Sequence, residues 1–229
     1  MKLLKLLSLW VGPLPRWYNR FVDQMRGYNT VDWECIVPPG RTADEQTAWV
    51  NRFATDRLGV RCNKMIGDNA LCDFRPTYGE LFPEKYQGYP WWGWCDLDVR
   101  FGDLDELLPR LLTDDWDVLN FKANYLSGCL AVLRNTPEIR GLYRKGPYRE
   151  ILVAPDYYVW DESGYPSKGN IRFLDLIEEA GLRVNQLSDL YSCRGAAGGD
   201  IVESRGKKLI VPKEVLLYHF MDDCWPEGV

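Results

Sequence analysis

Histidine is almost absent from this chain of 229 residues, which contains only His219, and several common catalytic motifs are missing altogether. There is no Walker loop, no Gly-x-Gly-x-x-Gly fingerprint, no Gly-x-Ser-x-Gly elbow and no His-Glu-x-x-His pair. Any Ser-His-Asp or Cys-His system would have to use His219. These absences set aside the P-loop, dinucleotide-binding, α/β-hydrolase and zinc-protease signatures.

The chain also lacks a basic excess, a Cys-x-x-Cys pair and a long apolar run. Its formal net charge of −5 argues against tight, sequence-independent binding to nucleic acid. Seven scattered cysteines predict reduced, mostly buried thiols in a cytoplasmic protein, or in the host cytoplasm if the protein is viral. No stretch reaches the ~18 apolar residues of a membrane span. Residues 1–12, interrupted by Lys5, predict a first buried strand rather than a secretion signal.

Strands, turns and helices alternate along the chain, which predicts an α/β fold with a mostly parallel central sheet. Thr42 and Glu45 have the spacing of a capping box at a helix start. We expect one domain, residues 1–229. The expected helices are 16–26, 42–58, 75–86, 104–112, one from 137 and 173–180, and the expected strands are 2–11, 31–37, 91–95, 116–121, 129–133, 208–211 and 215–220.

Two carboxylates, Asp96 and Asp98, follow the strand-like run that starts at Trp91. Alternate side chains of an extended backbone share a face, so both carboxylates can reach one point. Carboxylate oxygens suit a divalent cation that in turn holds phosphates. The other interpretation is a solvated pair that caps the next helix. The neighbouring Trp91, Trp92 and Trp94 are expected in the core.

His219 lies among apolar residues in a late strand, where a lone histidine is often a core residue. Its neutral imidazole would also suit Mn²⁺ beside two carboxylates. Asp222 and Asp223 follow closely and compete as ligands, although an exposed acidic terminus is the favoured interpretation for them.

One block of sequence is more specific than the Asp-x-Asp pair alone. The block is Cys72-Asp73-Phe74-Arg75-Pro76-Thr77-Tyr78-Gly79-Glu80-Leu81-Phe82, Gly88-Tyr89 and 92–104, from Trp92-Gly93-Trp94-Cys95-Asp96-Leu97-Asp98 to Leu104. It resembles the central signature of small glycosyltransferase-like proteins of bacteria and their viruses, which are similar in turn to GT-A nucleotide-sugar transferases of the glycogenin-like and capsular-polysaccharide types. Similar segments follow at 127–136 and 160–162, so the resemblance covers roughly residues 1–165 and returns at His219.

This resemblance implies a Rossmann-like GT-A fold with helices on both faces, residues 1–100 forming the nucleotide-sugar half and residues 101–229 the acceptor half. It implies that Asp96, Asp98 and His219 hold Mn²⁺ or Mg²⁺ on the diphosphate of a nucleotide-sugar donor. It places Asp73 and Arg75 against the donor.

The chain departs from the pattern after His219, where related transferases often carry a lysine aimed at the leaving diphosphate. Residues 220–229 contain no Lys or Arg. Either Arg75, Arg194, Lys207 or Lys208 takes that role, or the ion carries most of it.

An acceptor hydroxyl needs a general base if transfer inverts the sugar. Asp161 and Glu162, which follow an aromatic run, are the predicted pair, with a surface turn as the alternative. Tyr158 and Trp160 are predicted to stack on a sugar or base. Ser127 and Gly128 either admit the donor sugar close to the backbone or form a plain turn.

Together these features predict a metal-dependent glycosyltransferase. The alternatives are a metal-dependent phosphoesterase or nucleotidyltransferase, and an inactive nucleotide-sugar-binding module. The acceptor is predicted to be a glycan, a lipid-linked sugar, a protein or a hydroxymethylated pyrimidine in viral DNA. The net charge leans against DNA, although a groove would suffice if it used Arg140, Arg144, Lys145, Arg149 and Lys168.

Overall fold

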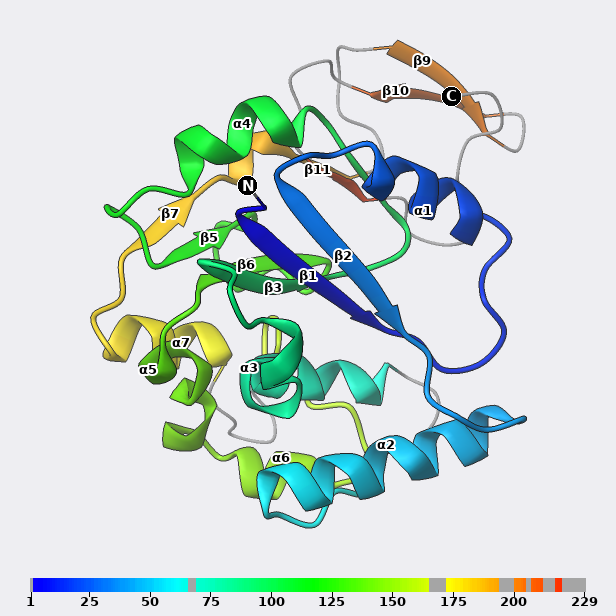
Figure 1. Ribbon diagram of the computed structural model, residues 1–229, viewed down its shortest axis with the longest axis vertical. Helices are drawn as coiled ribbons and strands as arrows, with labels where there is room; N and C mark the ends of the chain where they lie inside the picture. The colour runs from blue at the N-terminus through cyan, green and yellow to red at the C-terminus, as the bar shows by residue number, and fades with distance from the viewer. Residues whose placement is uncertain are drawn as a thin grey trace.

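The computed structural model describes residues 2–65, 69–164, 172–193, 200–204, 207–211 and 217–219, with the backbone alone at residue 189 and from residue 191 onward. The described strands form a six-stranded sheet of order β2-β1-β3-β6-β5-β7, a three-stranded sheet β4-β11-β8 and a β9-β10 pair (Figure 1). The six strands of the large sheet are β1 (Leu4–Leu9), β2 (Val31–Ile36), β3 (Trp91–Cys95), β5 (Val118–Asn120), β6 (Leu130–Arg134) and β7 (Val184–Gln186).

The sheet is mostly parallel, as the sequence predicts. β1 pairs in parallel with β2 and β3, and β5 pairs in parallel with β7, while β6 lies antiparallel between β3 and β5. The chain passes from β1 to β2 on one side and then returns to β3 on the other side of β1. Open α/β sheets bind ligands outside the carboxyl ends of their strands at such a reversal of strand order.

Helices cover both faces of this sheet, which confirms the expected α/β class (Figure 1). One face packs against α1 (Tyr18–Arg26) and α4 (Leu104–Leu111), through Phe21, Met25, Leu104 and Leu108. The other face packs against the remaining helices, which are α2 (Ala43–Leu58), α3 (Tyr78–Leu81), α5 (Pro137–Arg140), α6 (Tyr148–Val153) and α7 (Phe173–Glu179). The 3-10 helices are Ala70–Thr77, Pro83–Lys85, Leu142–Lys145 and Ser188–Leu190.

Strand β3 lies at the centre of both cores because its side chains alternate across the sheet. Trp92 and Trp94 are fully buried on the α2 face, and Trp91 and Cys95 on the α1 face. Burying an aromatic side chain fully stabilises a fold by roughly 1.5–3 kcal/mol relative to leaving it exposed. The prediction that these tryptophans are core residues is confirmed.

Two details of the predicted helices are wrong. The expected helix over 75–86 is broken into 3-10 turns and the short α3, because Pro76 and Pro83 cannot donate the backbone hydrogen bonds of a continuous helix. The capping box is half formed: the Thr42 hydroxyl accepts the Glu45 N–H at 3.2 Å, but the Glu45 carboxylate accepts the N–H of Arg41.

Two short strands bring the late part of the chain to the carboxyl end of β3. Strand β4 (Val99–Phe101) follows Asp98 directly and pairs with β11 (Leu217–His219), which pairs in turn with β8 (Tyr191–Cys193). The register sets His219 opposite Val99. The expected terminal strands correspond to β10 (Lys207–Val211), paired with β9 (Asp200–Ser204), and to β11.

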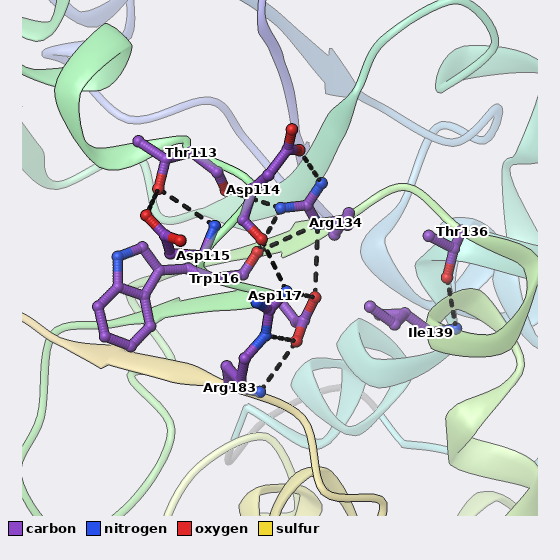
Figure 2. Close-up of polar contacts among 9 residues, drawn as sticks. All are labelled: Thr113, Asp114, Asp115, Trp116, Asp117, Arg134, Thr136, Ile139 and Arg183. Atoms are coloured by element: carbon purple, nitrogen blue, oxygen red, sulfur yellow. Dashed lines mark hydrogen bonds and ion pairs between the residues drawn. The ribbon is translucent and has the colours of Figure 1, made fainter.

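The β7 edge of the sheet is held by two arginines around one carboxylate. Asp117 lies between Arg183 and Arg134 (Figure 2). The distance from Arg183 Nε to Asp117 Oδ2 is 3.0 Å, and the distance from Arg134 Nε to Asp117 Oδ1 is 3.4 Å. Hydrogen bonds from Arg183 are the largest cause of the lowered pKa of Asp117. Arg134 also reaches Asp114 and lies over the ring of Trp91. This network ties the start of β7 to β5 and β6.

Asp105 joins the first turn of α4 to the turn before β2. Its carboxylate accepts the backbone N–H groups of Asn29 at 2.9 Å and Thr30 at 2.7 Å, and the Thr30 hydroxyl at 2.7 Å. Partial burial opposes ionisation, but these hydrogen bonds outweigh it and lower the pKa of Asp105 to about 2. The ionised carboxylate is therefore what holds the two segments together.

We expect Asp105→Asn to lower the free energy of unfolding by about 1–2 kcal/mol at pH 7. A lowered pKa contributes stability above the unfolded value near 4 that is lost as pH falls towards 2. The difference between wild type and variant should therefore shrink between pH ~4 and ~2 in urea unfolding. The exposed Asp23, replaced by Asn, is the control. An unchanged difference across that range would contradict the assignment.

Candidate active site at the carboxyl end of strand β3

The predicted metal-binding residue Asp96 is the first residue after β3, at the reversal of strand order. Its N–H donates to the Cys129 carbonyl at 2.9 Å, and its side chain is 26% exposed. Because β6 runs antiparallel to β3, the residues that precede β6 come to the point where β3 ends. This arrangement brings the predicted Ser127-Gly128 turn next to Asp96.

Arg75 is the centre of the site. It projects from the 3-10 helix Ala70–Thr77, and its guanidinium forms ion pairs with Asp96 and, at 2.7 Å, with Asp161. The same guanidinium donates to the Gly128 carbonyl at 2.9 Å. With its side chain only 13% exposed, Arg75 joins three segments that are far apart in the sequence.

Asp161 is fully buried, and both of its oxygens are engaged. One accepts from Arg75 and the other from the Tyr157 hydroxyl at 2.9 Å. Burial raises the pKa of Asp161 to about 7; Arg75 opposes this shift and Glu162 adds to it. Asp161 is thus a buried acid beside a cation, with a pKa close to neutral pH.

Glu162 lies against Gly128 and is more accessible than Asp161. Its Oε1 accepts the Gly128 N–H at 3.2 Å, and the side chain is half-buried. A Cβ at position 128 would lie 2.3 Å from that oxygen and 2.6 Å from the carboxyl carbon. Glycine is therefore required here for the close approach of a carboxylate.

Ser127 faces the protein rather than the site. It is fully buried, its N–H donates to Asn120 at 3.0 Å, and its hydroxyl lies 3.3 Å from the Cys129 sulfur. Its predicted contact with the donor stays a prediction, and the structure brings Gly128, not the Ser127 side chain, to Arg75.

Asp73 is buried below the site with a partner that the sequence analysis missed. It pairs with Lys64 at 2.7 Å, and both side chains are 0% exposed. Its carboxylate also accepts the N–H groups of Tyr158 and Trp160. The predicted contact of Asp73 with the donor stays a prediction. Lys64 gave no signal because nothing in its sequence neighbourhood marks a lysine for burial.

The prediction that Trp160 stacks on a ligand is wrong. Trp160 is fully buried and packs edge-on against Phe173, with ring centroids 5.8 Å apart. A ring without exposed surface has no face for a sugar. Tyr158 is half-buried, and Lys64 lies 5.2 Å from its ring centroid.

The interpretation of Asp96 and Asp98 as the cap of the next helix is also wrong. Helix α4 is capped by Asp103, whose carboxylate accepts the Glu106 N–H at 3.0 Å. Asp96 is instead paired with Arg75, and Asp98 is half-buried.

The predicted metal ligands are two carboxylates and an imidazole, a donor set that suits Mn²⁺ or Mg²⁺. No group of three acidic, His or Cys side chains converges as a metal site within the described residues. The third predicted ligand, His219, is described by its backbone alone. It pairs in register with Val99, the residue that follows Asp98 in the sequence. The other predicted candidates Arg194, Asp222, Asp223 and Lys168, and the side chains of Lys207 and Lys208, lie outside the described residues.

The five cysteines with described side chains are free thiols, as predicted: Cys35, Cys62, Cys72, Cys95 and Cys129. No helix among the described residues is long and apolar enough to cross a membrane.

Replacing Arg75 with Met should destabilise the protein by about 3–5 kcal/mol, because it leaves the buried Asp161 without its cation. Adding Asp161→Asn to that variant should restore part of the loss. Urea unfolding at pH 7 measures both effects. The control is Arg57→Met, which removes an exposed pair with Glu84 and should cost less than ~1 kcal/mol. Equal losses in the two arginine variants would show that Arg75 does not stabilise the site.

Comparison with known proteins adds a fold relationship. A search of curated proteins found no match. A solved structure described as that of a glycosyltransferase involved in the glycosylation of the major capsid of PBCV-1 superposes with a TM-score of 0.50. The alignment covers 96% of this chain and 93% of that chain, at 13% sequence identity. Likeness at this identity shows a shared fold.

A family model matches residues 6–189, which include the predicted site residues from Asp73 to Glu162. This chain therefore belongs to DUF6625, a family of unknown function.

Proposed function

We propose that this protein is a metal-dependent glycosyltransferase of GT-A type that moves a sugar from a nucleotide-diphosphate donor to a hydroxyl acceptor. The observation that carries the proposal is the contact of Arg75 with Asp96 at the end of β3 and with the buried Asp161. The fold shared with a glycosyltransferase supports it. So does the match to the glycosyltransferase-like signature around Arg75 and Asp96.

The donor's two phosphates need positive charge, most of all when the nucleoside diphosphate leaves. Asp96 and Asp98, with His219, would hold Mn²⁺ or Mg²⁺, which supplies that charge when bound. The carboxylates fit the ion because they are hard oxygen ligands at the end of a strand.

Arg75 is our candidate for the cation that contacts the leaving diphosphate. Residues 220–229 contain no Lys or Arg. Of the four candidates, Arg75 is the one whose side chain the structure describes, and it forms an ion pair with Asp96. A guanidinium presents paired N–H groups that match phosphate oxygens. Its hydrogen bonds to Asp161 and Gly128 hold that fork in place before a donor binds.

Glu162 is the stronger candidate for the general base. A base must reach the proton of the acceptor hydroxyl, within about 2.6–3.2 Å between heavy atoms. Glu162 is half-buried, and its described contact is the backbone N–H of Gly128, whereas Asp161 is fully buried between Arg75 and Tyr157. In this proposal Asp161 holds Arg75, and Glu162 takes the proton.

The acceptor is a hydroxyl compound such as a glycan. The proposal of a glycan, lipid-linked sugar or protein as acceptor needs no basic groove. Three of the basic residues considered for a DNA groove are exposed: Arg144, Lys145 and Arg149. Because Arg144 already pairs with Glu80 at 2.5 Å, this cluster gives no particular support to a DNA acceptor.

The first test concerns the ion and the donor. Screening nucleotide-sugars with Mn²⁺ present should reveal release of nucleoside diphosphate from at least one of them, and excess chelator should abolish it. Asp98→Asn should also abolish transfer and weaken Mn²⁺-dependent donor binding, because losing a charged ligand costs several kcal/mol of transition-state stabilisation. His219→Ala should reduce activity in the same assay.

Asp103→Asn is the matched control, because Asn also caps a helix well and Asp103 lies outside the site. Full activity of Asp98→Asn, or activity in chelator, would refute the metal site. Turnover of a nucleotide or phosphoester without sugar transfer would indicate a phosphoesterase or nucleotidyltransferase. Donor binding without any product would indicate an inactive binding module.

The second test concerns the base. Glu162→Gln should lower the rate of transfer by ~10²–10⁴-fold with nearly unchanged donor affinity, because the base meets the acceptor. Gly128→Ala should lower it as well, since the added Cβ displaces the Glu162 carboxylate. Kinetics with varied donor and acceptor separate the two effects.

Gly59→Ala is the control for adding a methyl group away from the site, because a Cβ there meets nothing within 4 Å. Its positive φ of +66° strains any residue with a Cβ, so this variant should lose stability but keep its rate of transfer. If Asp161→Asn lowers transfer while Glu162→Gln does not, the two residues exchange roles. If neither does, the base lies elsewhere or the enzyme retains the anomeric configuration.

A further inference from the structure

The loop that carries Asp161 and Glu162 contains a strained backbone position. Val159 has a φ of +54°, in the left-handed region that L-residues avoid. For a β-branched residue this conformation is a rare outlier that persists only where the surroundings hold it. The loop is therefore held in a shape that Val159 itself disfavours.

The residues on either side of Val159 donate hydrogen bonds to one carboxylate. Asp73 accepts the Tyr158 N–H at 2.8 Å through Oδ2 and the Trp160 N–H at 3.0 Å through Oδ1. Two hydrogen bonds from neighbours of one residue constrain the dihedral angles between them. The carbonyl of Val159 then accepts the N–H groups of Glu162 at 3.0 Å and Gly164 at 2.8 Å, which closes the turn.

Lys64 is the buried cation that pairs with the Asp73 carboxylate. It lies 2.7 Å from Asp73, donates to the Asp156 carbonyl at 2.7 Å and is as fully buried as its partner. A buried ion pair contributes little net stability, since desolvation offsets the attraction between its charges. Its effect here is geometric, because the Lys64–Asp73 pair holds both the start and the middle of the loop.

What the pair holds is the side of the site that faces the acceptor in the proposed reaction. The strained turn is followed at once by Asp161, which meets Arg75 and Tyr157, and by Glu162, which meets Gly128. A rotation at Val159 would move both carboxylates together. The hydrogen bonds described for Asp73 go to Lys64, Tyr158 and Trp160, on the loop side of the site.

We propose that Lys64 and Asp73 are positioning residues that hold Val159 in its left-handed conformation and thereby aim Asp161 and Glu162 into the site. The catalytic consequence rests on the proposed function. The constraint on Val159 does not, so the two parts are tested separately.

The constraint is tested by thermal unfolding of four variants. Gly tolerates a positive φ, while Ala keeps the strain of a Cβ, so Val159→Gly should melt ~2–4 °C above Val159→Ala. In an Asp73→Asn background the loop is released, and this difference should disappear. A difference that is absent in the wild-type background, or that persists in the Asp73→Asn background, would overturn the proposal.

If Asp73→Asn does not fold, amide hydrogen exchange in the wild-type protein tests the same constraint on Val159. The amides of Tyr158 and Trp160 should be protected, because both donate to the buried Asp73 carboxylate. Rapid exchange of either amide would also overturn the proposal.

The catalytic consequence is tested by kinetics well below the melting temperature. Asp73→Asn should lower kcat for sugar transfer ~10-fold or more while the donor KM and the Mn²⁺ dependence stay near wild type. A raised donor KM would instead support the donor contact that the family resemblance implies for Asp73, and would overturn the positioning role. Asp105→Asn is the control, since Asp105 in α4 also accepts two backbone N–H groups, but from the turn before β2, at the other end of the sheet. It should lose thermal stability and keep its kcat.

Equal kcat in the Asp73 and Asp105 variants would show that the pair is only structural. Absence of transfer by the wild-type protein with every donor would refute the proposed function instead. The melting and exchange experiments would still decide the constraint on Val159.

Discussion

The ion pairs of Arg75 with Asp96 and Asp161 are the interaction on which the site depends. They join the end of the central strand β3, the loop before β6 and the loop after α6. A buried carboxylate such as Asp161 is costly without a cation, and a buried guanidinium is costly without carboxylates. Each segment is therefore stabilised by the others at this point. The sheet supports this arrangement, because the antiparallel β6 returns the chain to the carboxyl end of β3.

A second buried pair lies under the first and acts in a different way. Lys64 and Asp73 are farther from solvent than Arg75 and contact backbone groups of the loop. Arg75 binds the loop through a side chain, Asp161, whereas Asp73 determines the path of its backbone. Three ion pairs in one small region would be an inefficient way to add stability. They are better understood as geometric constraints, those of Arg75 on the charges of the site and that of Lys64 with Asp73 on the strained turn at Val159.

The fold could be predicted from sequence wherever local pattern and tertiary packing agree. The run from Trp91 to Cys95 has apolar side chains for both faces of a sheet, and it forms β3 with the expected bounds. Prediction failed where distant partners decide: β4 exists because β11, more than a hundred residues later, pairs with it. The expected helix at 75–86 overlooked two prolines. Trp160 was mistaken for a ligand-stacking residue because aromatic composition does not tell a buried ring from an exposed one.

The same contrast explains which site residues the sequence could find. Asp96, Arg75, Gly128, Asp161 and Glu162 were predicted from motifs and a family resemblance, and the structure brings them within one set of contacts. Lys64 was not predicted, because a lysine becomes a buried partner only when the fold sets it beside Asp73. The strain at Val159 was equally hidden, since nothing in Tyr-Val-Trp suggests a positive φ. Motifs indicate candidate groups for ligand contact, whereas the groups that hold them in position are specified by three-dimensional contacts. In this protein the proposed chemistry rests on residues that motifs and the family resemblance indicate, whereas the geometry proposed to hold them rests on the three-dimensional contacts of Lys64 and Asp73.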